Sequence, residues 1–177
     1  MGGLLVGLLR DSWTLFAVSV GILMPGHPAE DLGQVWIEHE GRVKPFAEFA
    51  QEFVRDVTGT AQLGGQDPVV TVLHMLADPG RWEAVACIKV PRQARPRLGL
   101  ARDATLVSQR QLQAHPRLDA VLEAVRGRLE RGRPLTPLER GLAVVDRRRQ
   151  ALEALINQEL RLVPPADAAD GWQPILR

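Results

Sequence analysis

Apolar residues recur at helical spacing in the first half of the chain. One stripe, with intervals of three and four residues, predicts a helix over residues 45–58. Pro45 suits its first position and Gly59 suits its C-terminal cap. A second predicted helix begins after Asp67, an N-cap residue type, and ends before Asp78. The stripe of the first helix consists of Phe46, Phe49, Ala50, Phe53, Val54 and Val57.

The C-terminal half predicts two longer amphipathic helices. The first has an apolar stripe over residues 118–129, and the second covers residues 137–160. Between them, residues 131–135 (RGRPL) break the helical pattern. Thr136 then caps the second helix, with Glu139 at the reciprocal position of a capping box. Two such helices with a short linker predict an antiparallel helical hairpin.

The strand patterns are short. Apolar and polar residues alternate across residues 33–43 (GQVWIEHEGRV), and Glu40–Gly41 supplies a tight turn, so this segment predicts a β-hairpin. Residues 84–90 (AVACIKV) predict one more strand, which ends at Pro91. The predicted fold is therefore mainly α with a small β element. In it, the helical hairpin packs on shorter helices and a short β-hairpin.

The N-terminal region is the most apolar part of the chain. Residues 4–24 are long enough to cross a membrane once, although Arg10 and Asp11 interrupt them. The sequence therefore predicts a signal peptide or membrane anchor over residues 1–29 and an exported domain over residues 30–177. The alternative is that the N-terminal segment is a buried helix of a soluble domain.

Composition argues against nucleic-acid binding. The formal net charge is +1, whereas proteins that bind DNA usually carry a clear basic excess. Aromatic residues make up only 5 % of the chain and tyrosine is absent, so surfaces that stack single-stranded bases are scarce.

The residue types needed for catalysis are not arranged as a site in the sequence. Cys87 is the only cysteine and lies in an apolar run, which predicts a buried, inert thiol. His74 lies among apolar residues of a predicted helix, where a core or helix-surface position is expected. No pair of histidines has metal-binding spacing, and no phosphate loop or nucleophile motif is present. The chain is therefore not expected to be an enzyme or to bind a metal or cofactor itself.

One basic run lies inside the last predicted helix. Residues 146–150 (DRRRQ) have two interpretations. The first is a solvated helix face whose arginine stems cover apolar surface. The second is a contact for an acidic partner or for lipid head groups.

Three segments together resemble a known family. They are GRVKPFAEFAQEFVRDVTGT (residues 41–60), DPVVTVLHMLADPGRWEAVACIKV (residues 67–90) and INQELRLVPPADAADGWQPI (residues 156–175). In order and spacing they are similar to the extracytoplasmic region of the cytochrome c biogenesis proteins of the CcsA/ResC type, the System II cytochrome c synthases, often fused to a ResB-like part. Glu48 departs from the family pattern, which has Thr or Ser there. The resemblance covers about residues 35–177.

The resemblance implies a role in cytochrome c maturation on the extracytoplasmic (periplasmic) side of the cell membrane. The family's tryptophan-rich haem-handling segment and its haem-ligating membrane spans are absent from this sequence. Haem is therefore a cofactor of the parent system and not of this chain. The implied partners are the remaining membrane parts of the synthase, the membrane, and apocytochrome c. The alternative function is a soluble helical adaptor that binds an unrelated protein.

Arg42 and Lys44 are the candidate interaction residues. Both lie in the GRVKP turn, and we expect both side chains to face outward. The hypothesis is that they meet an acidic surface of the synthase or a haem propionate. The alternative is that Arg42 only bonds the end of a neighbouring helix.

Overall fold

The computed structural model describes residues 32–157. The predicted signal or anchor segment, residues 1–29, lies outside the described residues. So does most of the third segment of the family resemblance, from residue 158 onward.

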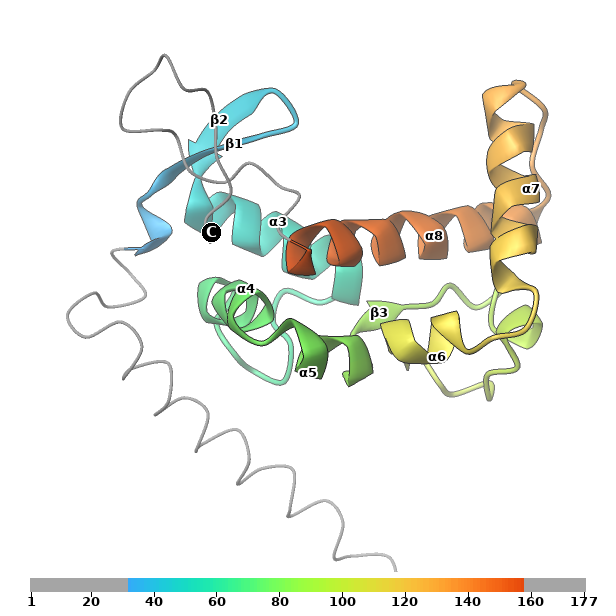
Figure 1. The fold of residues 1–177 in the computed structure, drawn as a ribbon, viewed down its shortest axis with the longest axis horizontal. Coiled ribbons are helices and arrows are strands. Elements are labelled where there is room, and N and C mark those ends of the chain that lie inside the picture. The colour runs from blue at the N-terminus through green and yellow to red at the C-terminus, as the bar shows by residue number, and fades with distance from the viewer. Residues whose placement is uncertain (1–31, 158–177) are drawn as a thin grey trace, which may run out of the picture.

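The described residues form a mainly helical fold with two small antiparallel hairpins, which confirms the predicted fold class (Figure 1). The strands are β1 (Trp36–His39), β2 (Arg42–Pro45), β3 (Ile88–Lys89) and β4 (Leu106–Val107). The helices are α3 (Phe46–Thr58), α4 (Pro68–Ala77), α5 (Pro79–Ala84), α6 (Gln109–Gln113), α7 (Leu118–Glu130) and α8 (Pro137–Ile156), with a short 3-10 helix at Pro96–Leu98.

The first hairpin forms as predicted. Strand β1 pairs with β2 in antiparallel register, with Ile37 opposite Lys44. Glu40 and Gly41 both have positive φ, 54° and 74°, which is the backbone of a tight two-residue hairpin turn. Gly41 N–H also donates to Glu38 Oε1 at 2.7 Å. The pairing register and the turn together fix the shape of the hairpin.

Helix α3 lies at the centre of the fold. It begins immediately after β2, with Pro45 as the extended N-cap rather than the first helical residue, and it ends at Gly59 with φ 70°. Its predicted apolar stripe is buried throughout. The helix contacts β1, β2, β3, α4 and α8, so elements from both halves of the described chain pack on it.

The segment after α4 differs from the prediction. Helix α4 forms as expected, and Asp67 Oδ1 accepts from Val69 N–H at 2.8 Å. Asp78 then caps α5, which takes up residues 79–84, because its Oδ1 accepts from Arg81 N–H at 3.2 Å. The predicted strand over residues 84–90 is therefore reduced to β3, and its partner β4 was not predicted.

The two C-terminal helices form, but they do not lie side by side. The capping box of Thr136 and Glu139 is present. Figure 1 shows α7 standing steeply across α8, so the predicted antiparallel arrangement is wrong in its angle. The reason is that α8 also packs against α3, α4 and β3. Only part of the length of α8 is therefore open to contact with α7. An ion pair between Arg126 Nε and the buried Asp146 carboxylate, 2.9 Å apart, holds the crossing.

The arginines of the basic run on α8 form ion pairs and hydrogen bonds within the described chain. Arg147 pairs with Asp56 of α3 at 2.6 Å. Arg148 donates to the Lys89 carbonyl oxygen at 2.8 Å. Arg149 pairs with Asp146 at 3.4 Å. Arg147 and Arg148 therefore tie α8 to α3 and β3, whereas Arg149 pairs within α8. The interpretation of the run as a contact for an acidic partner or for lipid head groups stays a prediction.

A buried histidine predicts a pH dependence. His74 is buried, and burial, followed by the charge of Arg81, holds its pKa below the ordinary value of 6.5. Its Nδ1 lies 3.0 Å from Gln66 Nε2, which donates to a neutral ring. The unfolded chain takes up a proton first as pH falls, so stability is complete above the unfolded pKa and decreases below it. We expect urea unfolding to show a smaller loss of stability between about pH 7.5 and about pH 5 in His74→Gln than in the wild type.

The pKa of His39 is also lowered by burial, so the variant keeps part of the pH dependence. Equal losses in the two proteins would show that His74 is not the neutral buried group described.

Candidate functional site

A groove beside the first hairpin is the candidate site. It has a volume of about 260 Å³ and lies between the β1–β2 turn, α3 and α8. We call it the hairpin groove. Its lining residues are His39, Glu40, Phe49, Glu52, Phe53, Asp56, Arg147 and Ala151. The floor is aromatic and the rim is charged.

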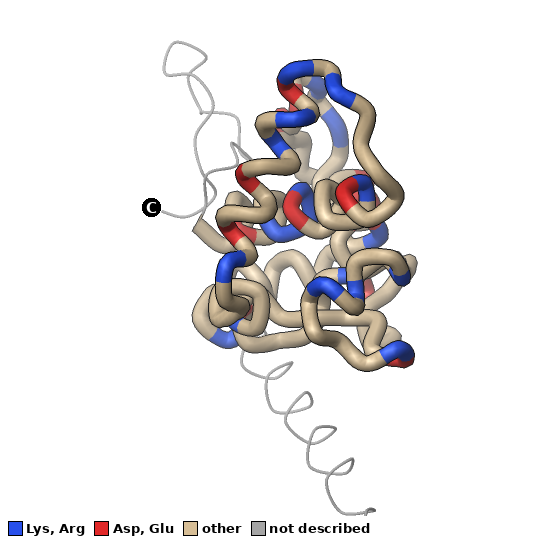
Figure 2. The backbone as a smooth tube through the Cα atoms, turned by 90° about the vertical axis from the view of Figure 1, so that its right-hand side faces the viewer, with Lys and Arg blue, Asp and Glu red and all other residues tan. Residues whose placement is uncertain are grey.

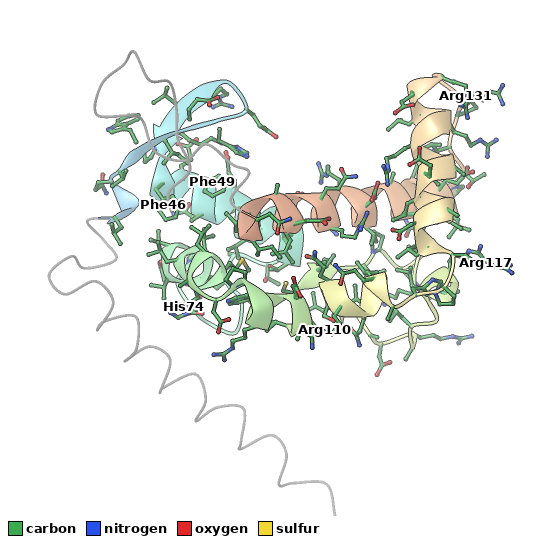
Figure 3. All side chains as sticks on the ribbon, viewed as in Figure 1. Phe46, Phe49, His74, Arg110, Arg117 and Arg131 are labelled. Carbon is green, nitrogen blue, oxygen red and sulfur yellow. The ribbon has the colours of Figure 1, made fainter. Side chains whose placement is uncertain are left out.

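Helical spacing on α3 builds this combination. Phe49 and Phe53 lie one turn apart and contact each other, with ring centroids 5.7 Å apart. Glu52 and Asp56 repeat the same four-residue spacing three positions later, which places two carboxylates along the rim. Figure 3 shows Phe46 and Phe49 on α3 beneath the hairpin.

Lys44 does not face outward, and this part of the prediction is wrong. Its side chain is only 6 % exposed and its Nζ pairs with Glu52. The side chain lies on the inner face of the hairpin because its register partner Ile37 is fully buried there. Glu52 remains 50 % exposed, and the bond from Lys44 holds its pKa below the ordinary value. Lys44 therefore acts as a structural cation within the fold.

Arg42 faces solvent, as expected. It has no ion pair or side-chain hydrogen bond with any residue in the range 32–157. It is opposite His39 in the hairpin register, and its charge helps to lower the pKa of Glu52. Arg42 thus lies beside the hairpin groove, and no bond to a helix end within the described range supports the alternative assignment.

His39 links the hairpin to the groove floor. Its ring packs edge-on against Phe49, with centroids 4.9 Å apart. Burial lowers its pKa, so the ring is neutral near pH 7. Its Nδ1 atom is buried and has no hydrogen-bond partner among the described residues. A neutral imidazole therefore stands at the mouth of the groove.

The rim charges are largely balanced. Glu52 is paired with Lys44, and Asp56 is paired with Arg147. Glu40 and Arg42 are exposed, and neither has an ion pair within the described residues. The groove therefore suits a mixed polar and apolar protein surface better than a single strongly charged group.

The groove is lined by aromatic, acidic and basic side chains together with His39. It contains no serine or cysteine nucleophile, and residues 32–157 contain no group of three metal-ligating side chains. Cys87 is buried elsewhere, and burial raises the pKa of its thiol to about 12, which confirms the predicted inert thiol. The arrangement is suited to binding.

Sequence reasoning found Arg42 and missed the rest of the rim. Glu52 and Asp56 were not singled out, and Arg147 was considered only as part of the basic run 146–150. The spacing of Glu52 and Asp56 on a predicted helix was visible. Their partners were not, because the ion pair from Asp56 to Arg147 joins residues 91 positions apart.

Comparisons with known proteins add no family assignment. No protein-family model matches the chain, and no curated protein matches it. Within residues 32–157, none of the helices has the length and apolar character to span a membrane.

The ion pair between Lys44 and Glu52 gives a stability prediction. Glu52→Ala leaves the Lys44 ammonium buried without its anion, which we expect to lower the free energy of unfolding by about 1–3 kcal/mol. Arg42→Ala removes only an exposed charge and is expected to change it by less than about 0.5 kcal/mol. Urea unfolding of both variants measures the difference.

The double variant Lys44→Met with Glu52→Ala is the control. It removes the stranded charge and is expected to recover part of the loss. An unchanged stability of Glu52→Ala would mean that Lys44 reaches solvent and is not a structural cation.

Proposed function

We propose that this chain is a non-catalytic extracytoplasmic domain of a cytochrome c maturation system and that it works by contact. The main support for the proposal is the way residues 41–60 fold. This segment has the most specific family resemblance. This segment folds as one continuous unit, from strand β2 through Pro45 to α3 and its Gly59 cap. A motif that builds a rigid joint supports a role in positioning a surface.

The surface is the hairpin groove together with Arg42. Arg42 is held at a fixed place by the β1–β2 register and by the inward anchor of Lys44. Under this proposal, the groove and Arg42 contact the membrane parts of the synthase or the apocytochrome c that it receives. Haem stays with those parts. The domain lies on the periplasmic side of the cell membrane, with residues 1–29 as its signal or anchor.

Charge reversal at Arg42 tests this role. We expect Arg42→Glu to lower the yield of c-type cytochrome with covalently bound haem by at least about tenfold, because the contact surface changes sign while the fold is kept. The yield is measured by haem staining in the host that carries the chain. Circular dichroism and urea unfolding confirm that the variant is folded.

The matched control is Arg55→Glu. Arg55 is also exposed on the same structural unit but does not line the groove. Alkaline phosphatase fused after Arg177 reports location, since that enzyme is active only in an oxidising exterior. An inactive fusion present in the cytoplasm contradicts the proposal and leaves the soluble adaptor. Equal cytochrome yields in wild type and Arg42→Glu contradict the role of Arg42.

A further inference from the structure

A second groove lies at the other end of the molecule. It is formed by the 3-10 helix, the open side of α7 and the first turns of α8, with a volume of about 500 Å³. We call it the α7 groove. Its floor contains Val121, Val125 and Leu142, and Leu138 stands at its edge, 38 % exposed. Ala120 and Ala124 are also part of the lining.

The small residues on α7 make the trough. At Ala120 and Ala124, one turn apart, the side chains end at Cβ, so the surface is low between the larger neighbours. Both alanines are exposed. A helix face with exposed alanines beside the buried Val125 and Leu142 leaves room for side chains from outside.

The mouth of this groove is cationic. Arg97 and Arg117 line it, and neither side chain has an ion pair or hydrogen bond among residues 32–157. Arg117 begins α7 with φ 63°, in the left-handed region that a non-glycine residue rarely adopts. Figure 3 shows its side chain pointing away from the body of the molecule at the end of α7.

The only carboxylate in the lining, that of Glu139, is already paired with an arginine. Glu139 accepts from Thr136 N–H at 2.8 Å and from the guanidinium of Arg128. The bond from the Thr136 backbone is the first cause of its lowered pKa. The positive charge of Arg97 and Arg117 is therefore not offset within the groove.

The segment of the chain around the α7 groove also has a net positive charge. Between Arg92 and Arg133 there are ten arginines and four carboxylates, a net charge of +6. Residues 32–91, which include the first hairpin, α3 and α4, have five cations and eight carboxylates, a net charge of −3. Figure 2, which faces the right-hand end of Figure 1, shows Lys and Arg positions spread along this end, with acidic positions among them.

We infer that the α7 groove binds an amphipathic acidic segment of another protein. Apolar side chains of the segment lie over Val125, Leu138 and Leu142, and its carboxylates pair with Arg97 and Arg117. The charge complementarity is the argument for an acidic partner, and the apolar trough is the argument for an amphipathic one. This inference does not depend on the proposed function, because it concerns a different surface.

A lipid surface fits this groove less well. Val125 and Leu142 form the floor of a hollow, where protruding side chains reach them and a flat bilayer surface does not.

The test uses a designed peptide as the probe. It has about 18 residues, leucines at helical spacing on one face, glutamates elsewhere and a fluorescent label. We expect it to bind the full chain in fluorescence anisotropy, and we expect the matching peptide with lysine in place of glutamate not to bind. Ala124→Trp fills the trough without a change of charge and is expected to weaken binding by at least about tenfold.

Two charge variants distinguish binding in the groove from nonspecific electrostatic attraction of the peptide. Arg97→Glu changes the mouth, and Arg131→Glu makes the same charge change in the α7–α8 linker outside the lining residues. We expect a loss of at least about tenfold for Arg97→Glu and less than about twofold for Arg131→Glu. Equal losses would overturn the inference, because the peptide would then respond only to net charge. Circular dichroism confirms that each variant is folded.

Two further results would also overturn it. One is equal binding of wild type and Ala124→Trp to the peptide, together with cosedimentation of both with vesicles containing about one-third phosphatidylglycerol, which would identify a membrane-binding surface instead. The other is self-association of the wild type in sedimentation velocity that Ala124→Trp abolishes, which would identify a second copy of the chain as the occupant.

Discussion

The burial of one face of α3 is the constraint on which the described structure depends. Phe46, Phe49 and Phe53 lie along this face and contact one another in sequence, with centroid separations of 5.9 Å and 5.7 Å. Each such side chain contributes about 1.5–3 kcal/mol when it is fully removed from water. The hairpin, α4, α8 and β3 all pack on this helix.

The same helix positions the candidate site. Its buried side fixes the hairpin, and the residues at the border of that side, Glu52 and Asp56, hold Lys44 and Arg147. These two ion pairs join α3 to β2 and to α8, so the groove walls have fixed positions relative to one another. Binding by such a surface requires little ordering of its own side chains, which is favourable for affinity. The α7 groove is different, because α7 is joined to the rest chiefly through its crossing with α8.

The sequence predicted elements well where local chemistry decides them. The α3 stripe, the Asp67 cap, the Glu40–Gly41 turn and the Thr136 capping box are all written in residues a few positions apart, and all are confirmed. The sequence-based predictions failed where contacts between distant parts of the chain decide the position of a side chain or a helix. The orientation of Lys44 depends on which face of a two-stranded hairpin meets α3, and the contacts of Arg147 and Arg148 depend on partners from α3 and β3. The crossing of α7 over α8 likewise depends on which sides of α8 other elements occupy.

Native-state hydrogen exchange is the most direct test of the central position of α3. The account predicts that the amides of Phe53, Val54 and Val57 exchange only with the free energy of global unfolding, because every element packed on α3 must leave before they open. Amides of α7 are predicted to exchange at a lower free energy, through an opening that leaves α3 protected. The account would be contradicted if α3 amides exchanged through a local opening while α7 stayed protected, since the rest of the fold would then hold together without its central helix.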